Sequence, residues 1–217
     1  MKQCQYYFVF GEEFIGPVIP TTQSIKTICE LLLEDKHEEA KGILKSEYPF
    51  ILVERVKRKT LSAGESMDVF LRDGFIDRYS GSHLVFPGSL RLIHRLLPSE
   101  FPFHTNWKMS ETHMAFWELL PTIDHVVPVA RGGTETFDNW VSTSQLRNSI
   151  KSNWLLEEIG WDLKEPGNLS DWDGLTSWFI QYVDSHSKHL TDPYIKRWYS
   201  AALPHFKKQW IHVLRTT

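Results

Sequence analysis

Three polar side chains in the segment 122–151 have the types needed to hold a divalent cation against a phosphodiester and to activate water. Asp124 and His125 are adjacent, and Asn148 follows in the same segment. Carboxylate and amide oxygens suit Mg²⁺, which keeps several of its waters and takes few protein ligands. An imidazole can accept a proton from water near physiological pH. These residue types predict metal-assisted hydrolysis, with Asp124 and Asn148 as metal ligands and His125 as the general base.

Two short strands and a helix are expected to position these groups. Residues 122–129 are rich in β-branched side chains and favour a strand, and Gly132 with its neighbouring glycine permits a tight reversal. A second strand is predicted at 137–141, and a helix with a Ser or Thr cap at 142–159. Successive side chains leave a strand on opposite faces. The carboxylate and the imidazole can therefore share one cleft only if the first strand ends beside them.

The polar residues, taken with their spacing, resemble the active-site motif of the HNH endonucleases, the ββα-metal nucleases. Asn139 follows His125 by 14 residues, and Asn148 follows Asn139 by nine, which are ordinary spacings for that family. The resemblance covers about residues 64–160. It implies that His125 is the general base, that Asn139 pins the loop and helps to orient the base, and that Asp124 and Asn148 hold the metal.

The resemblance also implies a substrate and a cofactor. Arg131, Lys151 and Arg147 stand where phosphate-contacting cations are expected, so the implied partner is DNA. The implied cofactor is a divalent metal, Mg²⁺ with Mn²⁺ as a substitute, and the implied products carry 5′-phosphate and 3′-hydroxyl ends. Restriction and phage defence are compatible roles. Two alternatives stay open: a catalytically silent HNH-fold module that binds nucleic acid, and a nuclease that acts on RNA or single strands.

One departure from the family concerns zinc. Many HNH domains bind a structural zinc through two Cys-x-x-Cys knuckles, but the matching positions here are Asp77, Ser80, Ser144 and Arg147. Without thiolates, no structural zinc of that kind is expected. We expect Asp77 and Arg147 to form an ion pair across this place, with the two serines hydrogen-bonding nearby.

Composition limits the class of protein further. Hydrophobic residues make up 41% of the 217 residues, which is enough for a real core. The net charge is −3, and residues 61–165 carry 9 basic and 14 acidic side chains, so DNA binding requires a local basic stripe. Two cysteines, no apolar leader and no membrane-spanning run predict a cytoplasmic protein without membrane association.

The predicted fold class is α+β, with a ββα-metal core, helical additions at the C-terminus and a small α/β N-terminal region. We expect a region of unknown role at 1–60, a nuclease domain at 61–165 with an insertion at 82–121, and a helical extension at 166–217. A homodimer would match the two-fold symmetry of duplex DNA. Further predicted elements are strands within 5–20 and 49–54 and helices at 22–46, 64–76, 90–97, 110–120, 173–186 and from 193.

Overall fold

A computed structural model describes residues 22–47 and 59–216, with side chains as far as Phe206. The chain divides into two compact units, residues 1–56 and residues 57–217. The strands predicted within 5–20 and 49–54 lie outside the described residues.

The first unit contains two helices, α1 (Thr22–Leu33) and α2 (His37–Glu47), which contact each other. The single helical region predicted at 22–46 is therefore interrupted. The break lies at Asp35, whose φ of 59° is in the left-handed region that ends a helix. Ile28 from α1 and Ala40 from α2 are the buried apolar residues of this pair.

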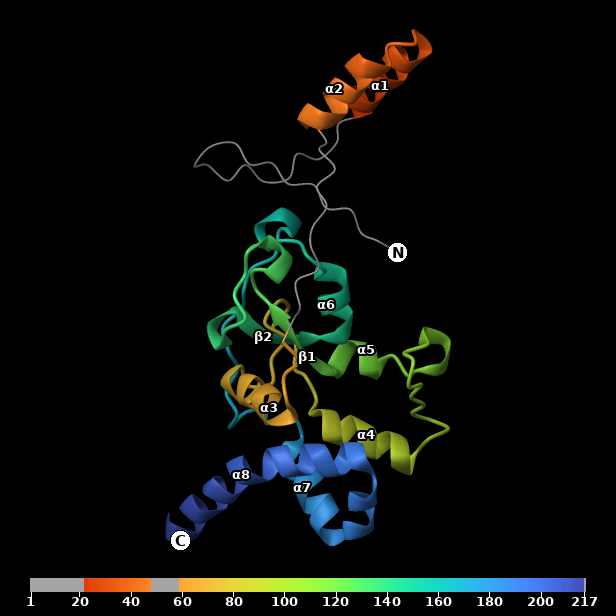
Figure 1. Cartoon of the computed structure of the whole chain (residues 1–217). Helices are drawn as coiled ribbons and strands as arrows, with labels where there is room; N and C mark the ends of the chain where they lie inside the picture. Colours follow the sequence, from red (N-terminus) through yellow and green to blue (C-terminus); the bar gives the residue numbers. More distant parts are fainter. Residues whose placement is uncertain (1–21, 48–58, 217) are drawn as a thin grey trace. The chain divides into compact units, whose positions relative to one another are not determined.

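The second unit is a mixed α+β fold (Figure 1). Its described regular elements begin with α3 (Ala63–Arg72), α4 (Pro87–Leu96) and the short α5 (Ala115–Leu119). The strands β1 (Pro121–His125) and β2 (Trp140–Ser144) follow, and then the helices α6 (Gln145–Lys151), α7 (Thr176–Ser185) and α8 (Pro193–Thr216). Single 3₁₀ turns occur at Met109–Glu111, Val129–Arg131, Phe137–Asn139, Glu157–Ile159 and Ser187–Thr191.

A capping box fixes the start of α3. The Ser62 hydroxyl accepts a hydrogen bond from the Glu65 amide at 3.1 Å, and the Glu65 carboxylate accepts one from the Ser62 amide at 2.8 Å. The side chain of Lys59 also donates to Glu65, at 2.7 Å. The bond from Lys59, followed by those from Ser62, lowers the pKa of Glu65 to about 2. These contacts anchor the segment that leads from Lys59 into α3.

The two strands pair antiparallel, and α6 follows β2 directly. His125 pairs with Trp140 at one end of the ladder, and Pro121 pairs with Ser144 at the other. The expected order of strand, loop, strand and helix is present, but each element is shorter or displaced. The first strand ends at His125 because the next residues turn into a clamped loop. The helix ends at Lys151 because Ser152 adopts a φ of 51°.

The hydrophobic core of the second unit contains residues from both its N-terminal and its C-terminal helices. The helix α8 contacts α3 and α4, and α7 contacts α4 (Figure 1). The ring of Phe86 lies 5.1 Å from that of Phe179 in α7 and 5.6 Å from that of Trp198 in α8. The described side chains between Leu169 and Phe206 therefore share a hydrophobic core with the segment that carries the candidate site. Across the described residues, no helix is long and apolar enough to cross a membrane.

Candidate active site

The loop between β1 and β2 is held closed by the side chain of Asn139. Its Oδ1 accepts a hydrogen bond from the amide of Val127 at 2.9 Å, and its Nδ2 donates to the carbonyls of Val127 and Thr134, both at 2.9 Å. A Cβ at Gly133 would lie only 1.8 Å from the Val127 carbonyl oxygen, so the loop requires glycine there. This is the loop-pinning role that the resemblance implies for Asn139.

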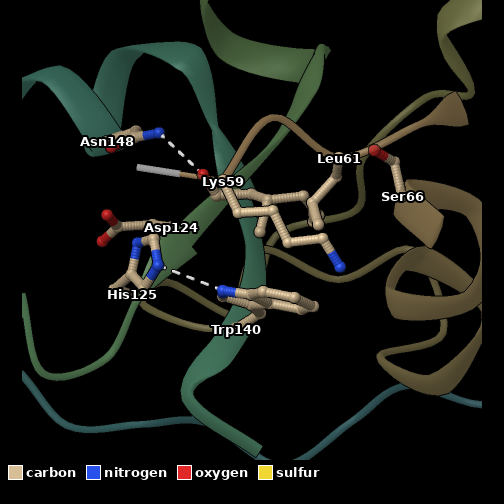
Figure 2. Close-up of a pocket in the computed structure, with 8 residues that line it drawn as sticks. Lys59, Leu61, Ser66, Asp124, His125, Trp140 and Asn148 are labelled. Atoms are coloured by element: carbon tan, nitrogen blue, oxygen red, sulfur yellow. Dashed lines mark hydrogen bonds between the residues drawn. The ribbon is translucent and has the colours of Figure 1, made fainter. Parts of the chain in front are cut away.

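The end of β1 and the start of α6 border a cavity of about 250 Å³ (Figure 2). Asp124, His125 and Asn148 all line it, with His125 as the last residue of β1. The structure thus brings together the three residues that carry the predicted chemistry. The remaining lining residues are Lys59, Leu61, Ser66, Ile123 and Trp140.

The Asp124 carboxylate is buried, and one of its two oxygens contacts other side chains of the protein. Its Oδ2 accepts a hydrogen bond from the Tyr79 hydroxyl at 2.7 Å and lies 2.9 Å from the ammonium of Lys151. Burial, and then the charge of Asp124, raise the pKa of Tyr79, so that hydroxyl remains a donor. Every contact of the carboxylate with a described side chain uses Oδ2, which leaves Oδ1 for a ligand in the cavity.

Lys151 occupies a different place from the one expected. Its side chain is fully buried, and its ammonium donates to the His125 carbonyl at 2.8 Å besides pairing with Asp124. It therefore has no exposed surface for a phosphate in this structure. Arg131 is likewise buried and paired with Glu158. Both predicted phosphate contacts fail to reach the surface because acidic residues elsewhere in the chain cover them.

Asn148 reaches the cavity from α6. Its Nδ2 donates to the Thr122 hydroxyl at 3.0 Å and approaches the Ile123 carbonyl at 3.4 Å. Both contacts use the amide nitrogen, so they orient the side chain and leave its carbonyl oxygen as the free acceptor. That oxygen is a hard ligand of the kind that Mg²⁺ prefers.

The imidazole of His125 is partly exposed, with 12% of its side chain accessible. Its Nε2 lies 3.0 Å from the Glu135 carboxylate and 3.0 Å from the indole nitrogen of Trp140. Burial acts to raise the pKa of Glu135, but the hydrogen bonds from His125 and the Lys59 backbone outweigh it, and the pKa is lowered. Glu135 thus remains ionised beside the proposed base.

The place of the absent zinc knuckles contains the predicted ion pair. Arg147 Nε lies 3.4 Å from the Asp77 carboxylate, which confirms that pairing. The buried carboxylate also accepts hydrogen bonds from the Tyr79 amide at 3.0 Å, the Thr143 hydroxyl at 3.1 Å and the Ser144 amide at 3.0 Å. Asp77 therefore ties the turn after α3 to β2, as a shared metal would. Arg147, with 39% of its side chain exposed, is the only one of the three predicted DNA-contacting cations at the surface.

Replacement of Asp77 by alanine should lower the free energy of unfolding by about 2–4 kcal/mol, because two buried amides and a hydroxyl would lose their acceptor. Arg147→Ala is the matched control. It should cost less than about 1 kcal/mol, because its partly exposed charge is screened by solvent. Urea denaturation of both variants measures the difference. Equal losses would show that the Asp77 carboxylate stabilises the fold through its ion pair with Arg147 and not through the hydrogen bonds it accepts.

Sequence reasoning missed Lys59 and Trp140, which line the cavity, and Tyr79 and Glu135, which contact Asp124 and His125. Tyr79 lies in the turn that the sequence singled out, where an aromatic residue precedes the knuckle position. Trp140 directly follows Asn139, within a predicted strand. Nothing in the spacing pointed to Glu135, since it lies in a loop whose path depends on the Asn139 clamp.

The donor set fits one hard divalent cation of low protein coordination. Within residues 22–47 and 59–216, no group of three or more His, Cys, Asp or Glu side chains could hold a metal ion. A carboxylate oxygen from Asp124 and an amide oxygen from Asn148 make a smaller site, which suits an ion that keeps most of its waters. The chain matches no protein-family model, and no curated protein or solved structure is detectably similar to it.

Proposed function

We propose that the protein is a metal-dependent endonuclease that hydrolyses DNA phosphodiester bonds, with a ββα-metal core formed by β1, β2 and α6. The observation that carries the proposal is the shared cavity of Asp124, His125 and Asn148. A carboxylate, an imidazole and an amide oxygen in one polar recess are a sufficient set for metal-assisted hydrolysis. The motif spacing and the Asn139 clamp add support from the loop between the strands.

Each side chain has a defined task in this proposal. A bound Mg²⁺ would supply positive charge to the phosphate and to the departing 3′ oxygen. Asp124 and Asn148 would hold that ion through Oδ1 of each. His125 takes a proton from the attacking water, and the hydroxide attacks phosphorus in line. The products then carry 5′-phosphate and 3′-hydroxyl ends.

We propose that a cation other than Arg131 and Lys151 contacts the phosphate of the substrate. With Arg131 and Lys151 buried, Lys59 is the cation that lines the cavity, and 48% of its side chain is exposed. Its present partner is Glu65, a solvated ion pair that a phosphate can replace at small cost. We keep duplex DNA as the substrate, a homodimer as the assembly that cuts both strands, and the cytoplasm as the compartment.

A supercoiled plasmid tests the enzyme directly. The full chain, with Mg²⁺ or Mn²⁺, should convert supercoiled DNA to nicked or linear forms, and a chelator should stop the conversion. End-labelling should find 5′-phosphate termini. Parallel reactions with RNA and single-stranded DNA would reveal a different preferred substrate. No cleavage of any of these with either metal would contradict the proposal.

Asn148→Ala should raise the Mg²⁺ concentration needed for half-maximal cleavage by roughly tenfold or more, because one of two protein ligands is lost. The maximal rate at saturating metal should fall less. The measurement is a metal titration of the initial rate. Ser149→Ala, on the same helix and exposed, is the control and should leave the titration unchanged. Identical titrations for the two variants would remove Asn148 from the metal site.

A second candidate function has one observation in its favour. The Lys151 ammonium already neutralises Asp124 at 2.9 Å, as it would in a module that binds nucleic acid without cleaving it. Such a module would retard DNA on a gel, independently of metal, and would leave the plasmid intact. We favour the enzyme because Oδ1 of Asp124 stays open and because His125 retains access to solvent.

A further inference from the structure

Glu135 lies beside the proposed base although nothing in the HNH motif assigns it a role. It belongs to the loop between β1 and β2, and 27% of its side chain is exposed. Its Oε2 lies 3.0 Å from His125 Nε2, and its Oε1 accepts the backbone amide of Lys59 at 3.2 Å. The carboxylate is therefore held from two sides, by the loop that carries it and by the segment that leads into α3.

The contacts at Nε2 decide which tautomer His125 adopts. Nε2 can either accept the indole proton of Trp140 or donate its own proton to Glu135. An unprotonated Nε2 would place its lone pair 3.0 Å from a carboxylate oxygen, which is repulsive. A hydrogen bond to an ionised carboxylate is stronger than one between two neutral groups, so the contact with Glu135 outweighs the contact with the Trp140 indole. We therefore favour donation from Nε2 to Glu135, in which the Trp140 indole no longer has His125 Nε2 as its acceptor.

The other ring nitrogen is then the only basic one. No side chain in the described part of the chain hydrogen-bonds Nδ1 of His125, whereas the residue itself lines the cavity with Asp124 and Asn148 (Figure 2). A base that is oriented by an acidic neighbour is the usual arrangement for activating a nucleophile. The proton taken from water would go to Nδ1, and Glu135 would remain a carboxylate throughout.

We infer that Glu135 is the positioning residue for His125: it accepts the Nε2 proton, fixes the imidazole in the Nε2–H tautomer and directs Nδ1 at the water. This inference rests on the proposed function. It adds a residue that touches neither metal nor substrate and acts only through the base. The Asn139 clamp holds the loop independently of Glu135, so the carboxylate can be removed without opening the loop.

The test compares three variants in plasmid cleavage with saturating Mg²⁺. Glu135→Ala should lower kcat about 10- to 100-fold, less than the loss expected when the base itself is removed, and should change KM less than about threefold. Glu135→Gln keeps an oxygen acceptor and should recover kcat to within about tenfold of the wild-type protein. Asp138→Ala removes an exposed carboxylate of the same loop and should leave both constants unchanged.

Nitrogen-15 NMR of the histidine rings gives a readout that does not depend on cleavage. In the wild-type protein at pH 8, the His125 signal should be that of a single Nε2–H tautomer, assigned by its loss in His125→Ala. In Glu135→Ala the tautomers should mix, and in Asp138→Ala they should not.

The outcomes distinguish a failure of the positioning role of Glu135 from a failure of the proposed nuclease function. A wild-type kcat and an unchanged tautomer in Glu135→Ala would overturn the positioning role while leaving the nuclease intact. An inactive wild-type protein would overturn the proposed function and with it the catalytic part of this inference. The NMR experiment would still decide whether Glu135 fixes the ring. A fall in kcat in Glu135→Ala with recovery in Glu135→Gln and tautomer mixing supports the inference.

Discussion

Replacement of His125 by alanine should reduce plasmid cleavage by at least about 10²–10⁴-fold, the range that a positioned general base contributes. The side chain lines the cavity and lies at the very end of β1, so its removal leaves the Asp124–Lys151 pair and the Asn139 clamp in place. Binding of the plasmid, measured by gel retardation with Ca²⁺ in place of Mg²⁺, should stay within a few-fold of the wild-type protein.

The control for that variant is His83→Ala. His83 is exposed and stacks on Trp172 with ring centroids 5.0 Å apart, away from the residues of the cavity. It should cleave at the wild-type rate. Full cleavage by His125→Ala with metal supplied would show that His125 is not the general base. Loss of activity in both variants would indicate a general loss of folding.

Lys151→Ala should produce the largest loss of stability, about 3–5 kcal/mol in the free energy of unfolding. The fully buried ammonium pairs with Asp124 and donates to the His125 carbonyl, so its removal leaves a buried carboxylate with only the Tyr79 hydroxyl as partner. Urea denaturation followed by circular dichroism measures the change. Because typical proteins are stable by only 5–15 kcal/mol, this loss is a large share of the total.

Lys188→Ala is the matched control for the lysine. Its side chain is exposed, so the change should stay within about 0.5 kcal/mol. A loss below about 1 kcal/mol in Lys151→Ala would mean that Asp124 finds another partner, such as solvent, when the lysine is gone. The ion pair would then contribute little, and the proposed division of work between Oδ1 and Oδ2 would lose its support.

The residues of the candidate site could be selected from the sequence because they lie in one short segment. Asp124, His125 and Asn148 were selected by type and spacing, and the structure places all three on one cavity. The pairing of Asp77 with Arg147 was also predictable, since an acid and a base stand at the two positions where metal ligands were expected. In both cases the partners occupy places that a local motif defines.

The burial of the predicted cations could not be predicted from the sequence in this way. Spacing puts Lys151 and Arg131 near the site, but it does not reveal that Asp124 and Glu158 cover them. Helical periodicity continues past Lys151, whereas the backbone turns at Ser152, so α6 is shorter than the pattern indicates. These differences arise from tertiary contacts, which override local propensity.

The C-terminal helices α7 and α8 could likewise be predicted only in part from the sequence. Asp173 and the Asp192-Pro193 pair marked the starts of α7 and α8, and the observed helices begin at Thr176 and Pro193. The sequence did not indicate what those helices would pack against. Their apolar faces meet Phe70, Phe75 and Phe86, which lie about 100 residues earlier in the chain, and only the folded structure reveals that match.

Anomalous diffraction from a crystal soaked in Mn²⁺ is the most direct test of the central claim. The account predicts one strong peak in the cavity, within about 2.0–2.3 Å of Oδ1 of both Asp124 and Asn148, with the remaining positions filled by water and with His125 Nδ1 facing one of those waters. A cavity without manganese at millimolar concentration, in a crystal where Lys151 still pairs with Asp124, would contradict it.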